Sequence, residues 1–200
     1  MCNRFRQLRT RADLSRIFNA RPLLDPPEVR TDIFPKYEAW VVRQDEAGER
    51  VLDFMPWGII RTMPGKRPGS MVKKAATNVR NLESSFWRST IAAPAQRCLV
   101  PFTSFAEPKP GKDEEDRPAN WWFELPAAEA SAFAGIWRYN EGAARFAFLT
   151  CEPNPLVAPL HPKAMPVVLQ PDDYDAWLSG EAADACRLAQ PFPSQLMAVS

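Results

Sequence analysis

The sequence has little of the material from which metal sites and disulfide networks are built. It contains four cysteines and one histidine in 200 residues. The cysteines are Cys2, Cys98, Cys151 and Cys186. They are widely spaced and form no Cys-x-x-Cys pair, so neither a disulfide framework nor a zinc knuckle is expected. With one histidine, the chain supplies no recognisable set of metal ligands, and we expect no metal and no cofactor.

Long apolar runs and an excess of one charge are also absent. The N-terminus has no apolar segment of signal-peptide length, and nowhere do about 18 apolar residues follow one another. We therefore expect a cytoplasmic protein, associated with the nucleoid if it is bacterial. Lys and Arg number 25 against 24 Asp and Glu, so the global charge neither favours nor excludes nucleic acid. A basic surface must come from local clusters of cations.

The hydrophobic pattern predicts a β-rich chain with short helices. Two hundred residues are typical of one domain with a substantial core, and we expect residues 1–200 to form it. The expected strands are 37–43, 50–57, 97–107 and 145–150, with a hairpin made by 120–125 and 132–139. The expected helices are 10–18, 171–179 and 181–188, with helical spacing also at 82–87.

The N-terminus holds a candidate nucleophile. If Met1 is removed, Cys2 carries a thiol and a free α-amine on adjacent carbons. The ordinary α-amino pKa is about 7.7–8.0 and that of cysteine about 8.5, so part of the amine is unprotonated near neutral pH. Such an aminothiol captures aldehydes, because the amine forms a Schiff base and the thiol then closes a thiazolidine ring. A frayed terminus without a function is the alternative interpretation of this position.

Cations cluster near the start of the chain, where Arg4 stands, and again between residues 61 and 80. The second cluster contains Lys66, Arg67, Lys73, Lys74 and Arg80. We expect residues 61–74, with their glycines and prolines, to form a flexible basic loop that can follow a phosphate backbone. A solubilising hairpin tip fits the same residues.

Asn78 and Arg80 stand two residues apart, so an extended backbone places both on one face. The amide can hold a sugar oxygen or a carbonyl, and the guanidinium can bind a phosphate through two hydrogen bonds. A helix cap with a surface ion pair is the simpler explanation of this short motif.

Glu107 and His161 are candidates for proton transfer. Glu107 follows two apolar residues at the expected end of the strand 97–107, where desolvation favours the neutral carboxyl group. A carboxylate that faces solvent is the alternative. His161 is the single histidine and titrates near neutral pH at the mouth of an expected strand. A lone histidine is more often structural than catalytic.

Four segments, in this order, resemble the SRAP family (SOS response-associated peptidase). MCNRF at 1–5 is similar to the family's N-terminus, and TNVR at 77–80 to its Asn-Ala-Arg segment. VPFTSFAEP at 100–108 is similar to the strand that ends in the family's active-site glutamate, and LHPKAMPVVL at 160–169 to its His-Asp-Arg-Met-Pro segment. The resemblance covers nearly the whole chain. It implies an α+β domain with a mostly antiparallel, barrel-like β core and several short peripheral helices.

The resemblance also implies a function in the response to DNA damage. Members bind single-stranded DNA and capture the ring-opened aldehyde of an abasic site as a thiazolidine crosslink. By this resemblance Cys2 is the nucleophile, and Asn78 orients the cysteine and the sugar. Glu107 is the acid–base group for ring opening and imine formation, and His161 assists proton transfer at the deoxyribose hydroxyl. The peptidase activity removes the residue before Cys2, and a lyase-like activity is a further implication.

For DNA binding, the resemblance implies that Arg4 and Arg80 hold the phosphates that flank the lesion. The basic loop adds Lys66, Arg67, Lys73 and Lys74, and we expect a monomer. The chain departs from the family pattern at Asn3, where glycine is usual, and at Pro108, where an aromatic residue is common. Residues 61–69 lack the tryptophans that some members stack on bases. These departures leave the residues of the covalent chemistry unchanged, and we expect them to affect how the chain binds DNA.

Two other functions remain open from the residues. A cysteine peptidase of the N-terminal-nucleophile kind requires an oxyanion hole and a substrate cleft, which the sequence does not reveal. A non-catalytic module that binds single strands would use the tryptophans and the basic loop. An adduct that requires both Cys2 and an abasic site separates these alternatives from aldehyde capture.

Overall fold

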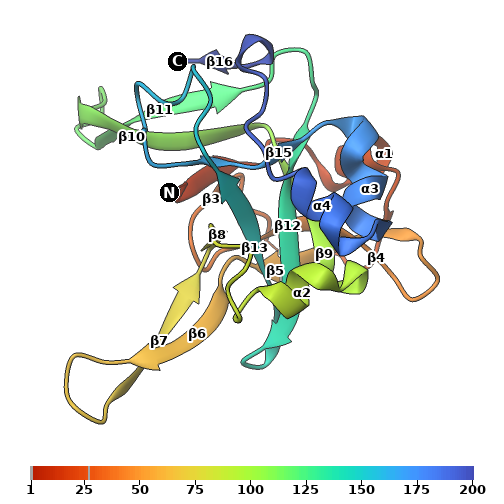
Figure 1. Ribbon diagram of the computed structural model, residues 1–200. Coiled ribbons are helices and arrows are strands. Elements are labelled where there is room, and N and C mark those ends of the chain that lie inside the picture. Colours follow the sequence, from red (N-terminus) through yellow and green to blue (C-terminus); the bar gives the residue numbers. More distant parts are fainter. Residues whose placement is uncertain (1, 27) are drawn as a thin grey trace.

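A computed structural model describes residues 2–26 and 28–200 of the chain (Figure 1). Strands make up 42% of the protein and helices 17%, which confirms the predicted α+β class with mostly antiparallel sheets. The expectation of a barrel-like core is wrong, because the sheets do not close. Met1, whose removal the candidate chemistry of Cys2 requires, and Pro27 lie outside the described residues.

The largest sheet within the described ranges has nine strands. Its long strands are β4 (Glu38–Gln44), β5 (Arg50–Pro56), β9 (Arg97–Phe102), β12 (Ser131–Asn140) and β13 (Ala143–Cys151). Short strands complete it: β2 (Arg21–Pro22), β8 (Asn78–Val79), β14 (Met165–Pro166) and β15 (Val168–Leu169). Strand β8 pairs in parallel with β13, with Asn78 opposite Phe148. This pairing holds Asn78 beside the C-terminal half of β13.

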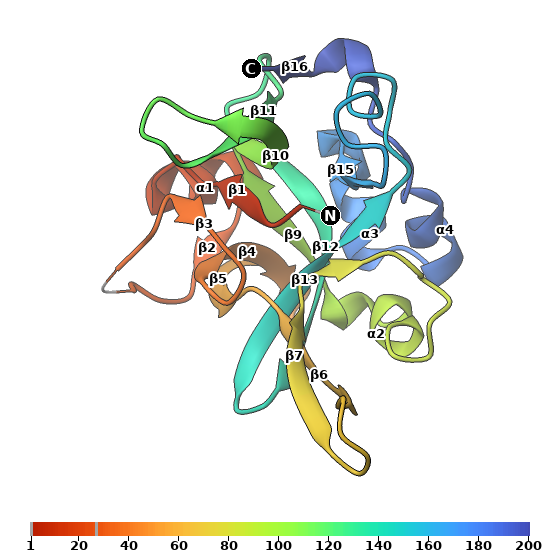
Figure 2. The same cartoon turned by 90° about the vertical axis from the view of Figure 1, so that its left-hand side faces the viewer.

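A second sheet of five strands contains the N-terminus. Its order is β16 (Ala198–Val199), β11 (Pro118–Glu124), β10 (Ser104–Lys112), β1 (Arg4–Arg6) and β3 (Asp32–Ile33). Strand β1 lies between β10 and β3, so the residues that follow Cys2 are held on both edges. Figure 2 shows the N-terminus near the middle of the molecule, beside β1.

The expected single strand 97–107 is wrong, because Thr103 separates β9 from β10. Strand β9 pairs with β12 and β4 in the larger sheet, whereas β10 pairs with β1 and β11 in the smaller one. Glu107 therefore lies within β10 and not at the end of a strand. Its cross-strand partner on β11 is Trp121.

The expected hairpin of 120–125 with 132–139 is also wrong. Residues 120–125 belong mainly to β11, which pairs with β10 and β16, and the charged segment 109–119 is mostly the hairpin between β10 and β11. Strand β12 forms its own hairpin with β13. Each of the two segments therefore forms a hairpin, but with its other neighbour in sequence.

Residues 61–74 form a projecting hairpin and not an irregular loop. Strands β6 (Ile59–Pro64) and β7 (Met71–Ala76) pair antiparallel from Ile59↔Ala76 to Pro64↔Met71. Residues 65–70 make the tip. In Figures 1 and 2 this ribbon extends away from the rest of the molecule.

The helices are short and peripheral, as expected. Helix α1 (Arg11–Phe18) begins with a capping box between Thr10 and Asp13, which satisfies two free N–H groups of the first turn. The other helices are α2 (Arg88–Ala92), α3 (Tyr174–Ser179) and α4 (Ala182–Arg187), and 3-10 turns cover Pro94–Gln96, Pro171–Asp173 and Ser194–Leu196. The helical spacing at 82–87 is not a helix, since α2 begins at Arg88. None of the described helices is long and apolar enough to cross a membrane.

Phe5 anchors the N-terminal strand in the core. Its ring is fully buried and makes edge contacts with Trp57, Phe133 and Phe148, at centroid distances of 5.1, 5.8 and 6.1 Å. Burial of a phenylalanine side chain contributes about 1.5–3 kcal/mol. This contact fixes the position of β1, and with it the position of Cys2.

Candidate active site

Cys2 is enclosed although it stands next to the chain terminus. Its exposed fraction is 1%. The thiol donates to the carbonyl oxygen of Arg4, with a sulfur–oxygen distance of 3.3 Å. Burial raises the pKa of the Cys2 thiol far above its ordinary value, and the negative charge of Glu107 raises it further. The sulfur is therefore a neutral thiol at physiological pH.

Asn78 holds the main chain of Cys2. Its Nδ2 donates to the carbonyl oxygen of Cys2 at 3.0 Å and to Oγ1 of Thr77 at 2.8 Å. Its Oδ1 is buried and accepts no hydrogen bond from the described residues. A buried acceptor of this kind favours a ligand that brings a donor, such as an amine or a hydroxyl group.

Glu107 is fully buried within β10. Burial raises the pKa of its carboxyl group to about 7, because the charged form loses its hydration. The group is thus divided between acid and base forms near neutral pH, as a proton-transfer catalyst requires. The alternative of a solvent-facing carboxylate is excluded by this burial.

His161 lies against Glu107. Its Nδ1 is 3.4 Å from Oε2 of the carboxyl group, and its side chain is 14% exposed. The segment before it is a turn in which the N–H of His161 donates to the carbonyl oxygen of Val157. Burial lowers the pKa of His161, so the ring is mainly neutral at pH 7.

Asn154 fixes the turn that presents His161, and the sequence analysis assigned no role to it. The residue is buried, and its Oδ1 accepts hydrogen bonds from the N–H groups of Leu156 and Val157. Its Nδ2 donates to the carbonyl oxygen of Phe192, near the C-terminus. An asparagine at the start of a turn is a recognisable capping signal, but its C-terminal partner is far away in sequence.

The four predicted residues converge from two strands, β8 and β10, from the segment before β1 and from one turn. Asn78 contacts Cys2, and His161 contacts Glu107. Strand pairing joins the two halves, because Arg4 lies opposite Ala106, next to Glu107. The arrangement places a cysteine next to the chain terminus, an amide, a carboxyl group of raised pKa and an imidazole around one buried point.

Comparison with protein families decides where this chain belongs. The family model described as "SOS response associated peptidase (SRAP)" matches residues 1–200. The chain is a member of the SRAP family. Membership supports a function associated with DNA damage. A comparison with curated proteins gives no match.

Solved structures show that the SRAP fold is retained at low sequence identity. A protein from Bordetella bronchiseptica has a TM-score of 0.78 at 23% identity, covering 100% of this chain and 98% of that one. A protein from Bacteroides thetaiotaomicron has a TM-score of 0.74 at 15% identity, covering 99% and 90%. A phage-related protein from Bordetella bronchiseptica has 0.71 at 22%, covering 100% and 93%. At these identities the likeness establishes the fold.

The two arginines expected to hold phosphates in this SRAP chain are both paired with carboxylates. Arg4 donates through Nε and Nη2 to the two oxygens of Asp32, at 3.0 and 2.8 Å. Arg80 forms an ion pair with Glu152. Each guanidinium keeps further N–H donors for a ligand.

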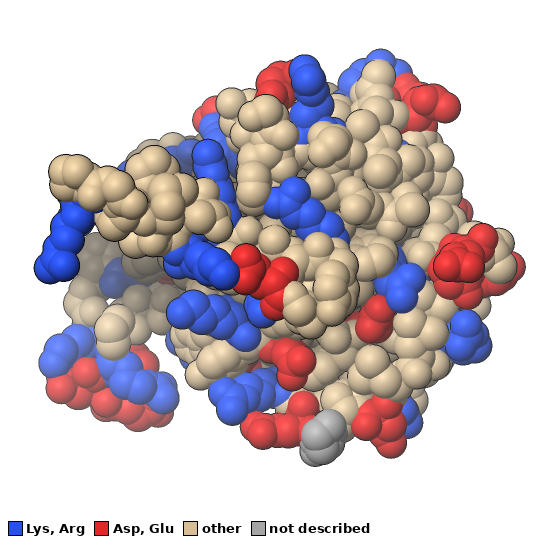
Figure 3. All heavy atoms as spheres, turned by 90° about the horizontal axis from the view of Figure 1, so that it is seen from below, with Lys and Arg blue, Asp and Glu red and all other residues tan. Residues whose placement is uncertain are grey.

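The other predicted DNA contacts lie on the projecting hairpin, away from the buried point. Lys66 and Arg67 are at its tip, and Lys73 and Lys74 are on β7. All four are exposed, and Lys73 is paired with Glu141 at 2.7 Å. Figure 3, seen from below, shows cations on this projection, and cations and carboxylates mixed over the rest of that face.

Proposed function

We propose that the protein captures the aldehyde of an abasic site in single-stranded DNA through Cys2, after removal of Met1, and forms a thiazolidine DNA–protein crosslink. The observation that carries this proposal is the enclosure of Cys2 between Asn78 and the Glu107–His161 pair. A terminal aminothiol beside a carboxyl group of raised pKa has the parts that imine formation and ring closure require.

The first bond forms between the α-amine of Cys2 and the aldehyde carbon. Attack by the free amine gives a carbinolamine, whose hydroxyl group must leave as water. Glu107 in its acid form donates the proton that water loss needs, and the product is a protonated imine that keeps the N–H of the former amine. With a pKa of about 7, the Glu107 carboxyl group still carries that proton in part of the molecules at neutral pH.

The second bond forms between the sulfur and the imine carbon. Because burial raises the pKa of the Cys2 thiol, the sulfur must lose its proton as it attacks. Glu107 is a carboxylate after the first step, so it accepts this proton and returns to its acid form, and the attack of sulfur on the protonated imine leaves the ring nitrogen as a neutral secondary amine. The cycle consumes no cofactor and releases one water molecule.

Asn78 and His161 have supporting roles in this proposal. Asn78 fixes the Cys2 carbonyl and offers its buried Oδ1 to the α-amine or to a sugar hydroxyl. Neutral His161, 3.4 Å from Glu107, can exchange a proton with the deoxyribose oxygen during ring opening. The same neighbourhood would assist hydrolysis of the Met1–Cys2 bond, which exposes the aminothiol.

The test is a denaturing gel of Met-trimmed protein with a single-stranded oligonucleotide that carries one abasic site. Mass spectrometry of the protein first establishes that Cys2 is the N-terminus. We expect a shifted band that requires both Cys2 and the lesion, and none with Cys2→Ala or with an undamaged strand. A Cys186→Ala variant is the matched control, because Cys186 lies on α4 and is not part of the site.

An adduct that survives Cys2→Ala, or that forms equally on undamaged DNA, contradicts the proposal. Reduction with borohydride gives a second readout, because it traps the imine but not the closed thiazolidine. Cys2→Ser keeps the amine and loses the sulfur nucleophile of the ring closure. We expect it to form a product that depends on borohydride, whereas the unaltered protein forms one that does not.

A further inference from the structure

The amide nitrogen of Asn78 has two acceptors within the protein. Its two N–H groups face the carbonyl oxygen of Cys2 at 3.0 Å and Oγ1 of Thr77 at 2.8 Å. A carbonyl oxygen can only accept, so Nδ2 and not Oδ1 must face Cys2. The buried Oδ1 is left over, and no other described group donates to it. The amide therefore presents an unused acceptor next to Cys2.

The backbone of Thr77 is anchored to the aromatic core. Thr77 is the single residue between β7 of the projecting hairpin and β8 of the larger sheet. Its carbonyl oxygen accepts hydrogen bonds from Nε1 of Trp57 at 3.0 Å and from the N–H of Phe148 at 3.2 Å. Trp57 is fully buried and its ring stacks on that of Phe148, with 5.1 Å between the centroids. The core therefore fixes Thr77 at the point where the hairpin joins the sheet.

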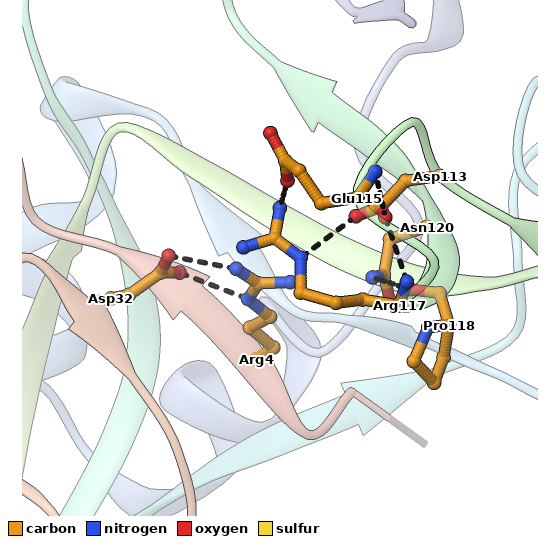
Figure 4. A network of polar contacts seen from close by, with 7 residues as sticks. All are labelled: Arg4, Asp32, Asp113, Glu115, Arg117, Pro118 and Asn120. Atoms are coloured by element: carbon orange, nitrogen blue, oxygen red, sulfur yellow. Dashed lines mark hydrogen bonds and ion pairs between the residues drawn. The ribbon is translucent and has the colours of Figure 1, made fainter.

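Strand β1, which follows the nucleophile, is held by the same core and by an ion pair on its outer face. Phe5 makes an edge contact with Trp57 at a centroid distance of 5.1 Å, so β1 and Thr77 share one anchor. Figure 4 shows Arg4 directed to Asp32 of β3, with hydrogen bonds of 3.0 and 2.8 Å. The amide nitrogen thus lies between a strand and a hydroxyl group that both have fixed positions.

The second hydrogen bond of this nitrogen restricts the rotation of the amide. The terminal torsion of an asparagine has a broad energy well, so an amide with one hydrogen bond can still turn about it. The bond to Oγ1 of Thr77 removes most of this freedom. Because Oδ1 belongs to the same planar group, the position of the unused acceptor is fixed as well.

We propose that Thr77 is a positioning residue for aldehyde capture at Cys2, because its hydroxyl group holds the Asn78 amide with Oδ1 as the acceptor for the α-amine. When Oδ1 accepts one N–H of the amine, the lone pair of the nitrogen keeps one direction for attack on the aldehyde. Thr77 acts through Asn78 and not on the reacting atoms. This inference rests on the proposed function, from which it takes the reaction.

The test removes the hydroxyl group of Thr77 and then restores it. Thr77→Val keeps the shape of the side chain and loses the acceptor, whereas Thr77→Ser keeps the acceptor and loses the methyl group. Thr10→Val is the matched control. It makes the same change at the cap of α1, where the N–H of Asp13 donates to Thr10 at 3.1 Å, and so costs stability away from the site.

Three quantities are measured for each variant. The first is the rate of adduct formation with an abasic single strand. The second is the affinity, by fluorescence anisotropy, for a strand with a tetrahydrofuran, which is an abasic analogue without an aldehyde. The third is the temperature of unfolding, which verifies that the variant is folded.

We expect Thr77→Val to slow adduct formation about 3- to 10-fold, the effect of one lost hydrogen bond, and to leave the affinity for the tetrahydrofuran strand unchanged. Thr77→Ser should retain the rate of the unaltered protein to within about twofold. Thr10→Val should lower the unfolding temperature without changing the rate. In the background of Asn78→Ala, Thr77→Val should slow the reaction no further, because its effect passes through that amide.

Equal rates for Thr77→Val and the unaltered protein overturn the assignment of Thr77. Equal slowing by Thr77→Ser or by Thr10→Val does the same, because the effect would then follow from packing or from stability. Undiminished slowing in the background of Asn78→Ala also overturns it, since Thr77 would act by another route. These outcomes leave the proposed function in place, whereas the absence of any adduct with the unaltered protein rejects that function and this inference together.

Discussion

The amide nitrogen of Asn78 lies 3.0 Å from the carbonyl oxygen of Cys2, although 76 residues separate them in the chain. Strand β8 carries Asn78 to this position through its pairing with β13. A terminus that would otherwise fray is thereby tied to the larger sheet. This hydrogen bond links the segment before β1 of the smaller sheet to β8 of the larger sheet, at the candidate active site.

Asn78→Ala removes this tie while leaving Cys2 in the chain. A single hydrogen bond contributes about 0.5–1.5 kcal/mol, so we expect a small loss of stability. The larger effect should be on the rate of adduct formation, because the aminothiol loses its fixed orientation. Quenched time courses with the abasic strand measure that rate. A rate equal to that of the unaltered protein would show that Asn78 does not orient the nucleophile.

Glu107→Gln should change how stability depends on pH. Burial raises the pKa of Glu107 from 4.5 to about 7, so the folded protein keeps a proton that the unfolded chain has released. The stabilisation is fully present below pH 4.5 and is lost as pH rises through about 7. We expect the free energy of unfolding of the unaltered protein to fall by roughly 3 kcal/mol over this pH range, and that of Glu107→Gln not to show this fall.

Urea unfolding of both proteins at pH 5 and pH 8 measures this difference. The lowered pKa of His161 acts in the opposite direction, since stability then rises as pH passes through its ordinary value of 6.5. Both proteins contain His161, so the part of its contribution that does not depend on its contact with Glu107 cancels in the comparison. Parallel pH profiles for the two proteins would contradict the raised pKa.

Gln7→Leu should destabilise the fold because Gln7 joins β1 to both β4 and β9. Its buried side chain donates to the carbonyl oxygens of Trp40 and Pro101, each at 2.8 Å, and accepts from the N–H of Trp40 at 3.0 Å. Leucine would leave these buried backbone groups without a partner, at a cost of about 2–4 kcal/mol. Chemical denaturation measures the loss. Gln44→Leu, at an exposed hydrogen bond with Ser179, is the control and should cost less than about 1 kcal/mol.

Gly135→Ala tests the close packing of β12 against β9. A Cβ atom at this position would lie 2.7 Å from Cγ2 of Val100 and 2.8 Å from Sγ of Cys98. Real side chains do not approach so closely, so the strands must shift, and we expect a loss of about 1–3 kcal/mol. Thermal unfolding measures it. Gly48→Ala is unsuitable as a control, because Gly48 has a φ of +81°. Ser194→Ala, on a peripheral 3-10 turn, serves instead.

The residues of the candidate site could be named from the sequence, because each belongs to a short segment with its own signal. Cys2 is marked by its position at the terminus, and His161 by being the single histidine. The expected helix 10–18 is likewise confirmed by α1 (Arg11–Phe18), since its N-cap signal at Thr10 and the helix lie within one turn of chain. The resemblance of four segments in order then supplied the family.

The tertiary structure alone decided how these segments meet. Strand pairing between distant segments divided 97–107 into β9 and β10, buried Glu107 and raised its pKa. It also placed Trp122 under Arg4 and Arg6, a contact that no local pattern indicates. Local propensity depends on a few neighbouring residues, whereas burial, pKa and the choice of strand partner depend on groups that lie far apart in sequence. The sequence by itself determined which groups are available for chemistry, and the fold determined their distances and protonation.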